Sequence, residues 1–270
     1  MWTGREWKKL LMESIYHRPK NLLIIADDLG LAESINDGIF FLLKEGKING
    51  ASLMANGEAF DDAVAKYLEA GLLNIGVHLV LVEEKPLSGM SLPKNHKMFF
   101  IKYLFGLIKL SEIEKELRTQ LQKVINAGIN PQFLNSHQHL HLLPGIMNVV
   151  VNLAREYKIS RIRIVNEPVD FFGGKLFRKV QLLFLNFLSR LAKRKIANVG
   201  LRSNDFFVGF LRAGDLGNRD LKHAQSLAGK YPDKIVELGC HPGYRDEELA
   251  KKYAWGGTYN WQKELDLLKL

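Results

Sequence analysis

The chain has 270 residues, of which 47% are hydrophobic, and its formal net charge is +9 at pH 7. A chain of this length and composition can bury a large core, as one domain of barrel size or as two smaller ones. The single cysteine, Cys240, excludes an intrachain disulfide, and no apolar run approaches the roughly 18 to 20 residues that a membrane-spanning helix needs.

The N-terminus lacks the continuous apolar segment of a signal peptide. We therefore expect a cytoplasmic protein, either free or peripheral at the inner membrane surface. Residues 1–20 form a basic, amphipathic extension to which we assign no catalytic role, and the domain is expected over residues 21–270.

Strand and helix patterns alternate along the rest of the chain. Residues 22–26 form a continuous apolar run, which is typical of a strand buried on both faces. The predicted strands are 22–26, 49–54, 74–81, 133–136, 160–165, 206–210 and 235–241. The predicted helices are 34–45, a stretch ending at 70, 111–128, 144–157, 175–196, 219–230 and 260–270. This order predicts one α/β domain with a mostly parallel sheet, either open or closed into a barrel.

Three local features refine this pattern. Ser34 is a candidate N-cap, and Ser111 to Glu114 has the form of a capping box. Residues 82–110 form a longer insertion that is broken by prolines in its first half, and we expect it to cover the mouth of a site.

The positive charge is concentrated in the segment 175–196, which has seven basic residues and no acidic one. The remainder is nearly balanced, so the charge does not predict a nucleic-acid binder. Apolar residues recur at helical spacing between the charged ends. Two interpretations follow: a helix that packs on the core with solvated ends, or an interfacial helix attracted to anionic lipid.

Polar residues follow the predicted strands at their C-terminal ends, where the strands of a (β/α) barrel converge on the active-site face. They are Asp27, Asp28, Asn56, His78, His137 and His241. Taken singly, each has an ordinary structural explanation: the aspartate pair could cap a helix, and His78 could be a core histidine. The thiol-protease interpretation of Cys240 and His241 fails because adjacent strand residues face opposite sides.

Residues 135–144 contain three of the eight histidines within five positions. If this stretch is extended, His137, His139 and His141 project from one face. Adjacent strand residues point in opposite directions, so Asp27 and Asp28 are expected to have different roles. Asp28, His78 and His137 would give a catalytic type of metal site, with one oxygen and two nitrogen ligands and with open positions. Asp27 would then act as the general base and His241 as the general acid.

Several motifs together resemble the YdjC-like carbohydrate deacetylases, which include chitooligosaccharide deacetylases and a hopanoid-associated HpnK-like branch. The motifs are Ala-Asp-Asp-Leu-Gly at 26–30, Met-Ala-Asn-Gly at 54–57, Gly-Val-His-Leu at 76–79, Asn-Ser-His-Gln-His-Leu-His at 135–141, Arg163 through Glu167-Pro168, and Cys-His-Pro-Gly at 240–243. The resemblance covers roughly residues 21–270.

The resemblance implies a distorted TIM-like (β/α) barrel of mostly parallel strands, and removal of acetyl from an N-acetylated amino sugar, either an oligosaccharide or a lipid-linked N-acetylglucosamine. Carried over by motif, the metal ligands fall on Asp28, His78 and His137, the base on Asp27 and the acid on His241. The predicted substrate-binding residues are Asn56, His139 and Arg163. For His139 and Arg163 the alternative role is to support the residues that contact the metal or the substrate.

The resemblance implies one divalent metal ion and favours magnesium, whereas two imidazole ligands equally favour zinc or another transition metal. The oligomeric state is open, with a homodimer among the options. The rival class of function is a non-catalytic glycan-binding or membrane-surface protein that retains the fold. Intact Asp27 and His241 argue against that class, because binding alone requires neither.

Overall fold

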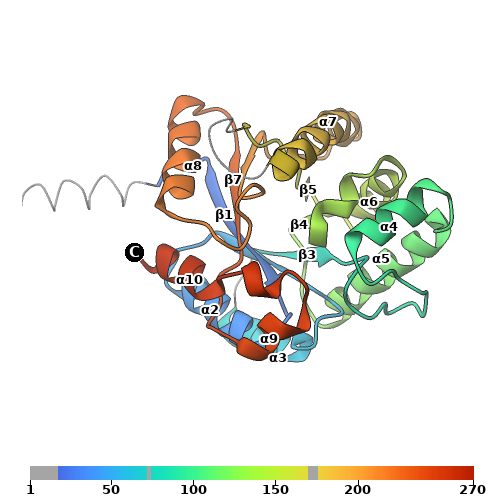
Figure 1. The fold of residues 1–270 in the computed structure, drawn as a ribbon, viewed down its shortest axis with the longest axis horizontal. Coiled ribbons are helices and arrows are strands. Elements are labelled where there is room, and N and C mark those ends of the chain that lie inside the picture. The colour runs from blue at the N-terminus through green and yellow to red at the C-terminus, as the bar shows by residue number, and fades with distance from the viewer. Residues whose placement is uncertain (1–17, 72–73, 170–175) are drawn as a thin grey trace, which may run out of the picture.

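The computed structural model describes residues 18–71, 74–169 and 176–270, so most of the predicted extension at 1–20, and Lys175 of the basic segment, lie outside the described residues. All seven predicted strands form, and they make one parallel sheet in the order β5-β4-β3-β2-β1-β7-β6 (Figure 1). The strands are β1 (Leu22–Leu29), β2 (Gly50–Leu53), β3 (Ile75–Leu79), β4 (Phe133–Ser136), β5 (Arg161–Ile162), β6 (Phe206–Val208) and β7 (Val236–Cys240).

The sheet curls into an incomplete barrel, and the prediction of a single distorted-barrel α/β domain is confirmed. Its two edge strands, β5 and β6, are not hydrogen-bonded to each other in the ladder. The gap between them is partly closed by Arg202, whose backbone nitrogen donates to Ser160 O and whose carbonyl accepts from Ile162 N, both at 2.9 Å. The carboxyl ends of the strands therefore face one common mouth.

The helices cover the outside of the sheet (Figure 1). They are α2 (Glu33–Lys44), α3 (Phe60–Ala70), α4 (His96–Leu104), α5 (Leu110–Asn126), α6 (Pro144–Glu156), α7 (Leu176–Asn198), α8 (Asn218–Lys230), α9 (Glu247–Lys252) and α10 (Trp261–Lys269). Helix α4 lies inside the 82–110 insertion and was not predicted, because its apolar residues are not confined to one face.

Both cap predictions were wrong. Ala32 is the N-cap residue of α2, and the Ser34 hydroxyl instead donates to Asp246 Oδ2 at 2.7 Å. Helix α5 begins one residue before Ser111, with Lys109 as its N-cap residue. Ser34 is therefore used in a tertiary contact, whereas α5 is capped locally by Glu112, whose Oε2 accepts from Lys109 N at 3.4 Å.

Two glycines of the sequence motifs bring the loops at the strand ends close together. A Cβ atom on Gly57 would lie 2.2 Å from the carbonyl oxygen of Gly30, and Gly30 itself has a φ of +89°. The loop after β1 and the loop after β2 therefore pack backbone against backbone, which any larger side chain would prevent. In the parts of the chain that the structure describes, no helix is long and apolar enough to cross a membrane.

Candidate metal centre and active site

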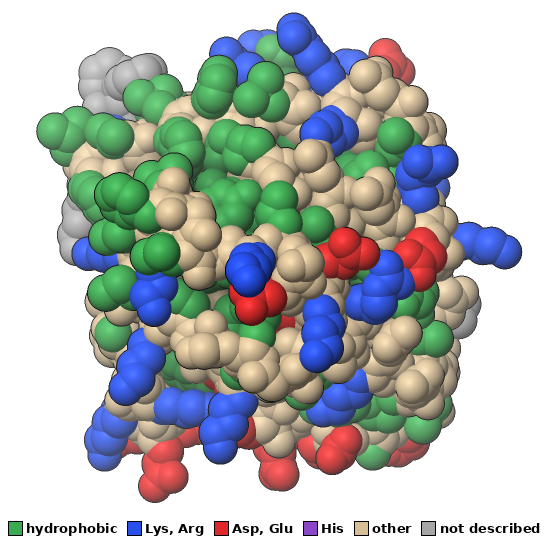
Figure 2. Space-filling view, turned by 90° about the vertical axis from the view of Figure 1, so that its right-hand side faces the viewer, with side chains coloured by type: hydrophobic (Ala, Val, Ile, Leu, Met, Phe, Trp, Pro, Cys, Tyr) green, Lys and Arg blue, Asp and Glu red, His purple; other side chains and the backbone are tan. Residues whose placement is uncertain are grey.

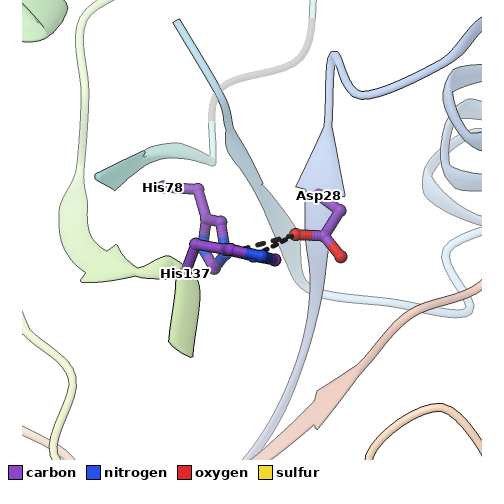
Figure 3. A group of neighbouring side chains, drawn as sticks. All are labelled: Asp28, His78 and His137. Carbon is purple, nitrogen blue, oxygen red and sulfur yellow. Dashed lines mark hydrogen bonds and ion pairs between the residues drawn. The ribbon is translucent and has the colours of Figure 1, made fainter. Parts of the chain in front are cut away.

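Three buried side chains converge at the mouth of the barrel, one from β1, one from β3 and one from the residue directly after β4 (Figure 3). One ligand atom from each of Asp28, His78 and His137 lies within 4.8 Å of the others. Oδ1 of Asp28 is 3.3 Å from His78 Nε2 and 3.2 Å from His137 Nδ1. The structure thus brings together the three residues that the sequence predicted as metal ligands.

The hydrogen bonds on the outer side of both rings prepare them to bind a cation. His78 Nδ1 donates to Asn135 Oδ1 at 2.8 Å, and His137 Nε2 donates to Glu83 Oε2 at 2.9 Å. In a neutral imidazole only one of the two nitrogens carries a proton. The other nitrogen, Nε2 of His78 and Nδ1 of His137, therefore has a free lone pair that faces Asp28 and can bind a metal. Oδ2 of Asp28 is buried without a hydrogen-bond partner. One carboxylate and two oriented imidazoles fit a divalent cation.

The surroundings of His137 are strongly negative. Burial lowers the pKa of His137, but its hydrogen bonds with Asp28 and Glu83 outweigh burial and raise that pKa to about 10. A potential that attracts a proton to this ring also attracts a metal cation.

A bulge in β1 directs both aspartates towards the same imidazole. The backbone of Asp28 is left-handed, with a φ of 63°, and the register with β2 shifts between Ala26 and Leu29. Asp27 Oδ1 consequently lies 3.9 Å from His78 Nδ1, while Asp28 faces His78 Nε2. The expectation that these neighbours point in opposite directions was wrong, because the bulge interrupts the strand alternation.

Asp27 is held by a buried polar network. Its Oδ1 accepts hydrogen bonds from Ser52 Oγ at 2.8 Å and Asn135 Nδ2 at 2.9 Å, and its Oδ2 accepts from Arg163 Nη1 at 2.5 Å. Burial raises the pKa of Asp27, but Arg163, His78 and His241 together hold that pKa well below its usual value. Asp27 is therefore a carboxylate at any physiological pH.

Arg163 is 1% exposed and joins two carboxylates, Asp27 and Glu237. Its Nε donates to Glu237 Oε1 at 2.5 Å. Of the two roles that the sequence left open for Arg163, this position favours support of Asp27 over direct substrate contact.

The histidine run is not extended. Strand β4 ends at Ser136, and residues His137–Leu142 form the 3-10 segment η1, within which Gln138 and His139 have a φ of 55°. The three imidazoles consequently point to different places. His141 turns into the core, where its Nε2 donates to Arg163 O at 2.9 Å and its Nδ1 accepts from Ser136 Oγ at 2.6 Å. The condition for three imidazoles on one face, an extended run, is therefore not met.

His139 lies beside the aromatic rings of Phe207 and Phe210, with ring centroids 5.9 and 5.7 Å away. Its Nδ1 is buried without a hydrogen-bond partner. Burial, followed by the positive charge of Arg163, holds the pKa of His139 well below its usual value, so the ring is neutral. It can offer one hydrogen bond to a bound polar group.

His241 directly follows β7 and lines the same cavity as His137. Its backbone N–H donates to Glu264 Oε2 at 2.6 Å, and its Nδ1 lies 3.9 Å from the same carboxylate oxygen. The Tyr259 ring packs against the imidazole at 5.1 Å. Burial raises the pKa of Glu264 and outweighs the lowering by His241, so this carboxylate is sensitive to the charge on the ring.

A small cavity of about 50 Å³ joins the predicted catalytic residues to the metal cluster. Asp27, His78, His137, His139 and His241 all line it. Asn56 is not among the described residues that line it. Its Nδ2 instead donates to the backbone oxygen of Lys85, in the 82–110 insertion, at 3.1 Å. The substrate role of Asn56 stays a prediction.

Four residues at the site were missed by the sequence analysis. Glu83, from the start of the insertion, has a φ of 73° and accepts hydrogen bonds from His137 and from Trp255 Nε1, the latter at 2.6 Å. Arg178 of α7 and Tyr259 line the cavity itself. The aromatic-rich stretch 253–261 was a readable signal for Trp255 and Tyr259, whereas nothing near Glu83 marked it in the sequence.

Comparisons with known proteins agree with this geometry. The chain matches the family described as YdjC-like protein over residues 21–269. It is 30% identical over 250 residues to a protein named carbohydrate deacetylase from Brevibacillus brevis, covering 91% of this chain and 89% of that protein. A carbohydrate deacetylase from Geobacillus stearothermophilus is 28% identical over 254 residues, covering 93% of this chain and 89% of that protein.

Among solved structures, an Enterococcus faecalis protein described as a cellobiose-phosphate cleavage protein superposes with a TM-score of 0.67 at 21% identity. The match covers 92% of this chain and 90% of that one, and it shows a shared fold. The family match spans nearly the whole described domain and includes every residue of the metal cluster. The chain belongs to the YdjC-like protein family.

Proposed function

We propose that the chain is a metal-dependent hydrolase that removes the acetyl group from an N-acetylated amino sugar, and that it acts in the cytoplasm. One observation carries this proposal: His78 and His137 of the metal cluster line the same cavity as Asp27 and His241. The similarity to carbohydrate deacetylases supports the substrate class. A protein that only binds glycans would not need a carboxylate and an imidazole beside a cation site.

Asp28, His78 and His137 would hold the ion. When bound, a divalent cation supplies positive charge that polarises the acetyl carbonyl and lowers the pKa of a nearby water. Ligand type favours zinc or another transition metal, and the family resemblance favours magnesium. Asn135 and Glu83 keep the two imidazoles in the orientation that ligation requires.

The chain's own groups move the protons. Asp27 takes a proton from the attacking water, whose oxygen bonds to the acetyl carbon. His241, as imidazolium, gives a proton to the amide nitrogen, and the C–N bond breaks to release acetate and the free amine. Glu264 Oε2 lies 3.9 Å from Nδ1 of this imidazole and accepts a hydrogen bond from the His241 backbone N–H, which holds the residue in place. Arg163 keeps Asp27 ionised and in place.

The sugar would occupy the mouth between His139 and Tyr259. The unpartnered Nδ1 of His139 offers a hydrogen bond to a hydroxyl group, and the Tyr259 ring offers an apolar face to the sugar. Asn56 stays a candidate for contact with more distant parts of the substrate.

The test is acetate release from N-acetylglucosamine oligomers and from lipid-linked N-acetylglucosamine. Activity should disappear with a chelator and return when magnesium, zinc or cobalt is added back, which also identifies the ion. Acetate release that is indifferent to chelation would rule out the metal mechanism. The absence of release from any acetylated sugar, with the metal bound, would rule out the activity itself.

A further inference from the structure

Most of the large apolar side chains that are exposed in the described residues are gathered on α7 and on α4 with the segment that follows it. Among residues 18–71, 74–169 and 176–270, thirteen of the seventeen exposed large hydrophobic side chains lie either between Met98 and Leu110 or on α7. Those of α7 run from Leu176 to Leu191 and are 44–78% exposed. Figure 2 shows hydrophobic side chains gathered over part of one side of the molecule, with many Lys and Arg and fewer Asp and Glu on the same side. We call this surface the α4–α7 face.

Helix α7 is therefore not simply a core helix. It buries Leu182, Leu188, Ala192 and Ile196 against the domain, and a second apolar side remains exposed. Burial of one side fixes the helix to the barrel. An apolar surface of this extent on the other side is typical of an interaction site.

The two segments that form the α4–α7 face carry charge of one sign. Residues 94–110 contain four lysines and residues 176–198 contain six lysines or arginines, and neither segment contains an acidic residue. Exposed examples beside the apolar side chains are Lys97 and Lys102 on α4, and Arg190 and Arg194 on α7. Apolar side chains edged by Lys and Arg fit the boundary of a bilayer that contains anionic lipid. A second copy of the same face would instead bring like charges together.

A groove in this face leads to the catalytic cavity. The space between α4 and α7 has a volume of about 400 Å³ and is lined by apolar residues of both helices, among them Phe100 and Phe184, whose rings are 6.0 Å apart. Its inner end is formed by Gln138, His139, Arg178 and Phe210, which also line the catalytic cavity. An apolar chain in the groove would end beside the metal cluster.

We infer that the α4–α7 face docks on an anionic lipid bilayer and that the groove receives the apolar part of a lipid-linked amino sugar. The part of the inference that concerns the sugar head group rests on the proposed deacetylase function. The part that concerns the lipid rests on the residues of the α4–α7 face. The bilayer supplies the substrate from one side, so the sugar reaches His139 while its lipid stays between α4 and α7.

Docking is tested without turnover, by flotation of the full chain with vesicles. Vesicles of phosphatidylcholine mixed with phosphatidylglycerol should bind the protein at low salt, and vesicles of phosphatidylcholine alone should bind it more weakly. Replacing Leu183→Glu together with Phe187→Glu should weaken binding on the order of tenfold or more, because two apolar anchors are lost and the charge is reduced. Leu68→Glu on α3, at a side chain that is 60% exposed, is the matched control and should bind normally.

Substrate delivery is tested by acetate release from alkyl glycosides of N-acetylglucosamine. A long alkyl chain should lower KM relative to a methyl group, and Ile101→Trp at the groove should remove that advantage while the methyl glycoside reacts as before. No binding to anionic vesicles at low salt, binding that is unchanged in the double variant, or a dimer that buries this face would each overturn the inference. Vesicle binding by a chain that releases no acetate would contradict only the proposed chemistry.

Discussion

Nη1 of Arg163 donates a hydrogen bond to Oδ2 of Asp27 at 2.5 Å, although 136 residues separate the two in sequence. The same guanidinium pairs with Glu237, and all three side chains are at least 97% buried. Buried charges persist only when each has a partner. This network therefore joins the stability of the barrel to the protonation state of the proposed base.

Removing the arginine should destabilise the fold. Arg163→Met leaves the buried Asp27 without its arginine partner, whereas Glu237 keeps Arg161, whose Nη1 lies 3.1 Å from Glu237 Oε2. The loss of the buried pair with Asp27 should cost about 3–5 kcal/mol of unfolding free energy. Arg163→Lys keeps a charge and should cost less. Urea unfolding measures both, with Arg155→Gln on the exposed side of α6 as the control. A stability of Arg163→Met equal to that of the unaltered chain would mean that the network is not a stabilising element.

Replacing the proposed base should separate catalysis from metal binding. Asp27→Asn should slow acetate release on the order of 10² to 10⁴, the range for loss of a general base. Metal affinity should change little, because Asp27 lies outside the cluster of Asp28, His78 and His137. Acetate assays and calorimetric metal titration measure the two effects, with Asp61→Asn on α3 as the control. Normal turnover in Asp27→Asn would show that the two aspartates have been assigned the wrong roles.

Glu83 should raise the metal affinity of the site, although it is not one of the three predicted ligands. Glu83→Gln weakens the acceptor of His137 Nε2 and should lower metal affinity by about 10- to 100-fold, whereas His137→Ala should abolish tight binding. Glu69→Gln, at an exposed position of α3, should bind metal as the unaltered chain does. The assignment of Glu83 would be refuted by equal affinities in Glu83→Gln and Glu69→Gln, measured by competition with a chromogenic chelator.

His141 should make the fold sensitive to acid. Burial lowers the pKa of His141 from 6.5 to about 4. Above pH 6.5 the imidazole is neutral in both the folded and the unfolded chain. As the pH falls towards 4, only the unfolded chain gains the proton, so stability falls by up to about 3 kcal/mol.

The measurement for His141 is the free energy of unfolding at several pH values between 7 and 4. In His141→Gln this part of the pH dependence should be absent, although the variant is less stable at pH 7 because the hydrogen bonds to Ser136 and Arg163 change. His223→Gln, at an exposed site on α8, should retain the full slope. Equal slopes in both variants would show that another group titrates in this range.

Much of the fold and of the site was predictable because parallel strands leave a strong local pattern. Apolar runs of four to eight residues that end in polar residues marked the strands. The barrel then brought Asp27, His78, His137 and His241 to one cavity, as expected from strand ends that converge. Here the distant contacts follow from topology alone.

The parts that the sequence did not predict depend on local exceptions and on long-range pairing. The bulge at Asp28 and the left-handed turn at His139 break the two-residue alternation on which the side-chain directions were predicted. The contact between Glu83 and Trp255 joins an irregular insertion to a loop 172 residues away. Neither propensity nor periodicity specifies such a contact, because it forms only after the barrel has positioned both loops.

The left-handed backbone of Asp28 has a consequence for protein engineering. An aspartate with positive φ carries a conformational cost that glycine or asparagine would relieve, and its unpaired Oδ2 adds a desolvation cost. A library selected only for thermal tolerance would therefore favour replacement at this position and would lose the proposed cation site without any sign of misfolding. Selection of more stable variants of this protein should therefore include a measurement of metal binding at every round.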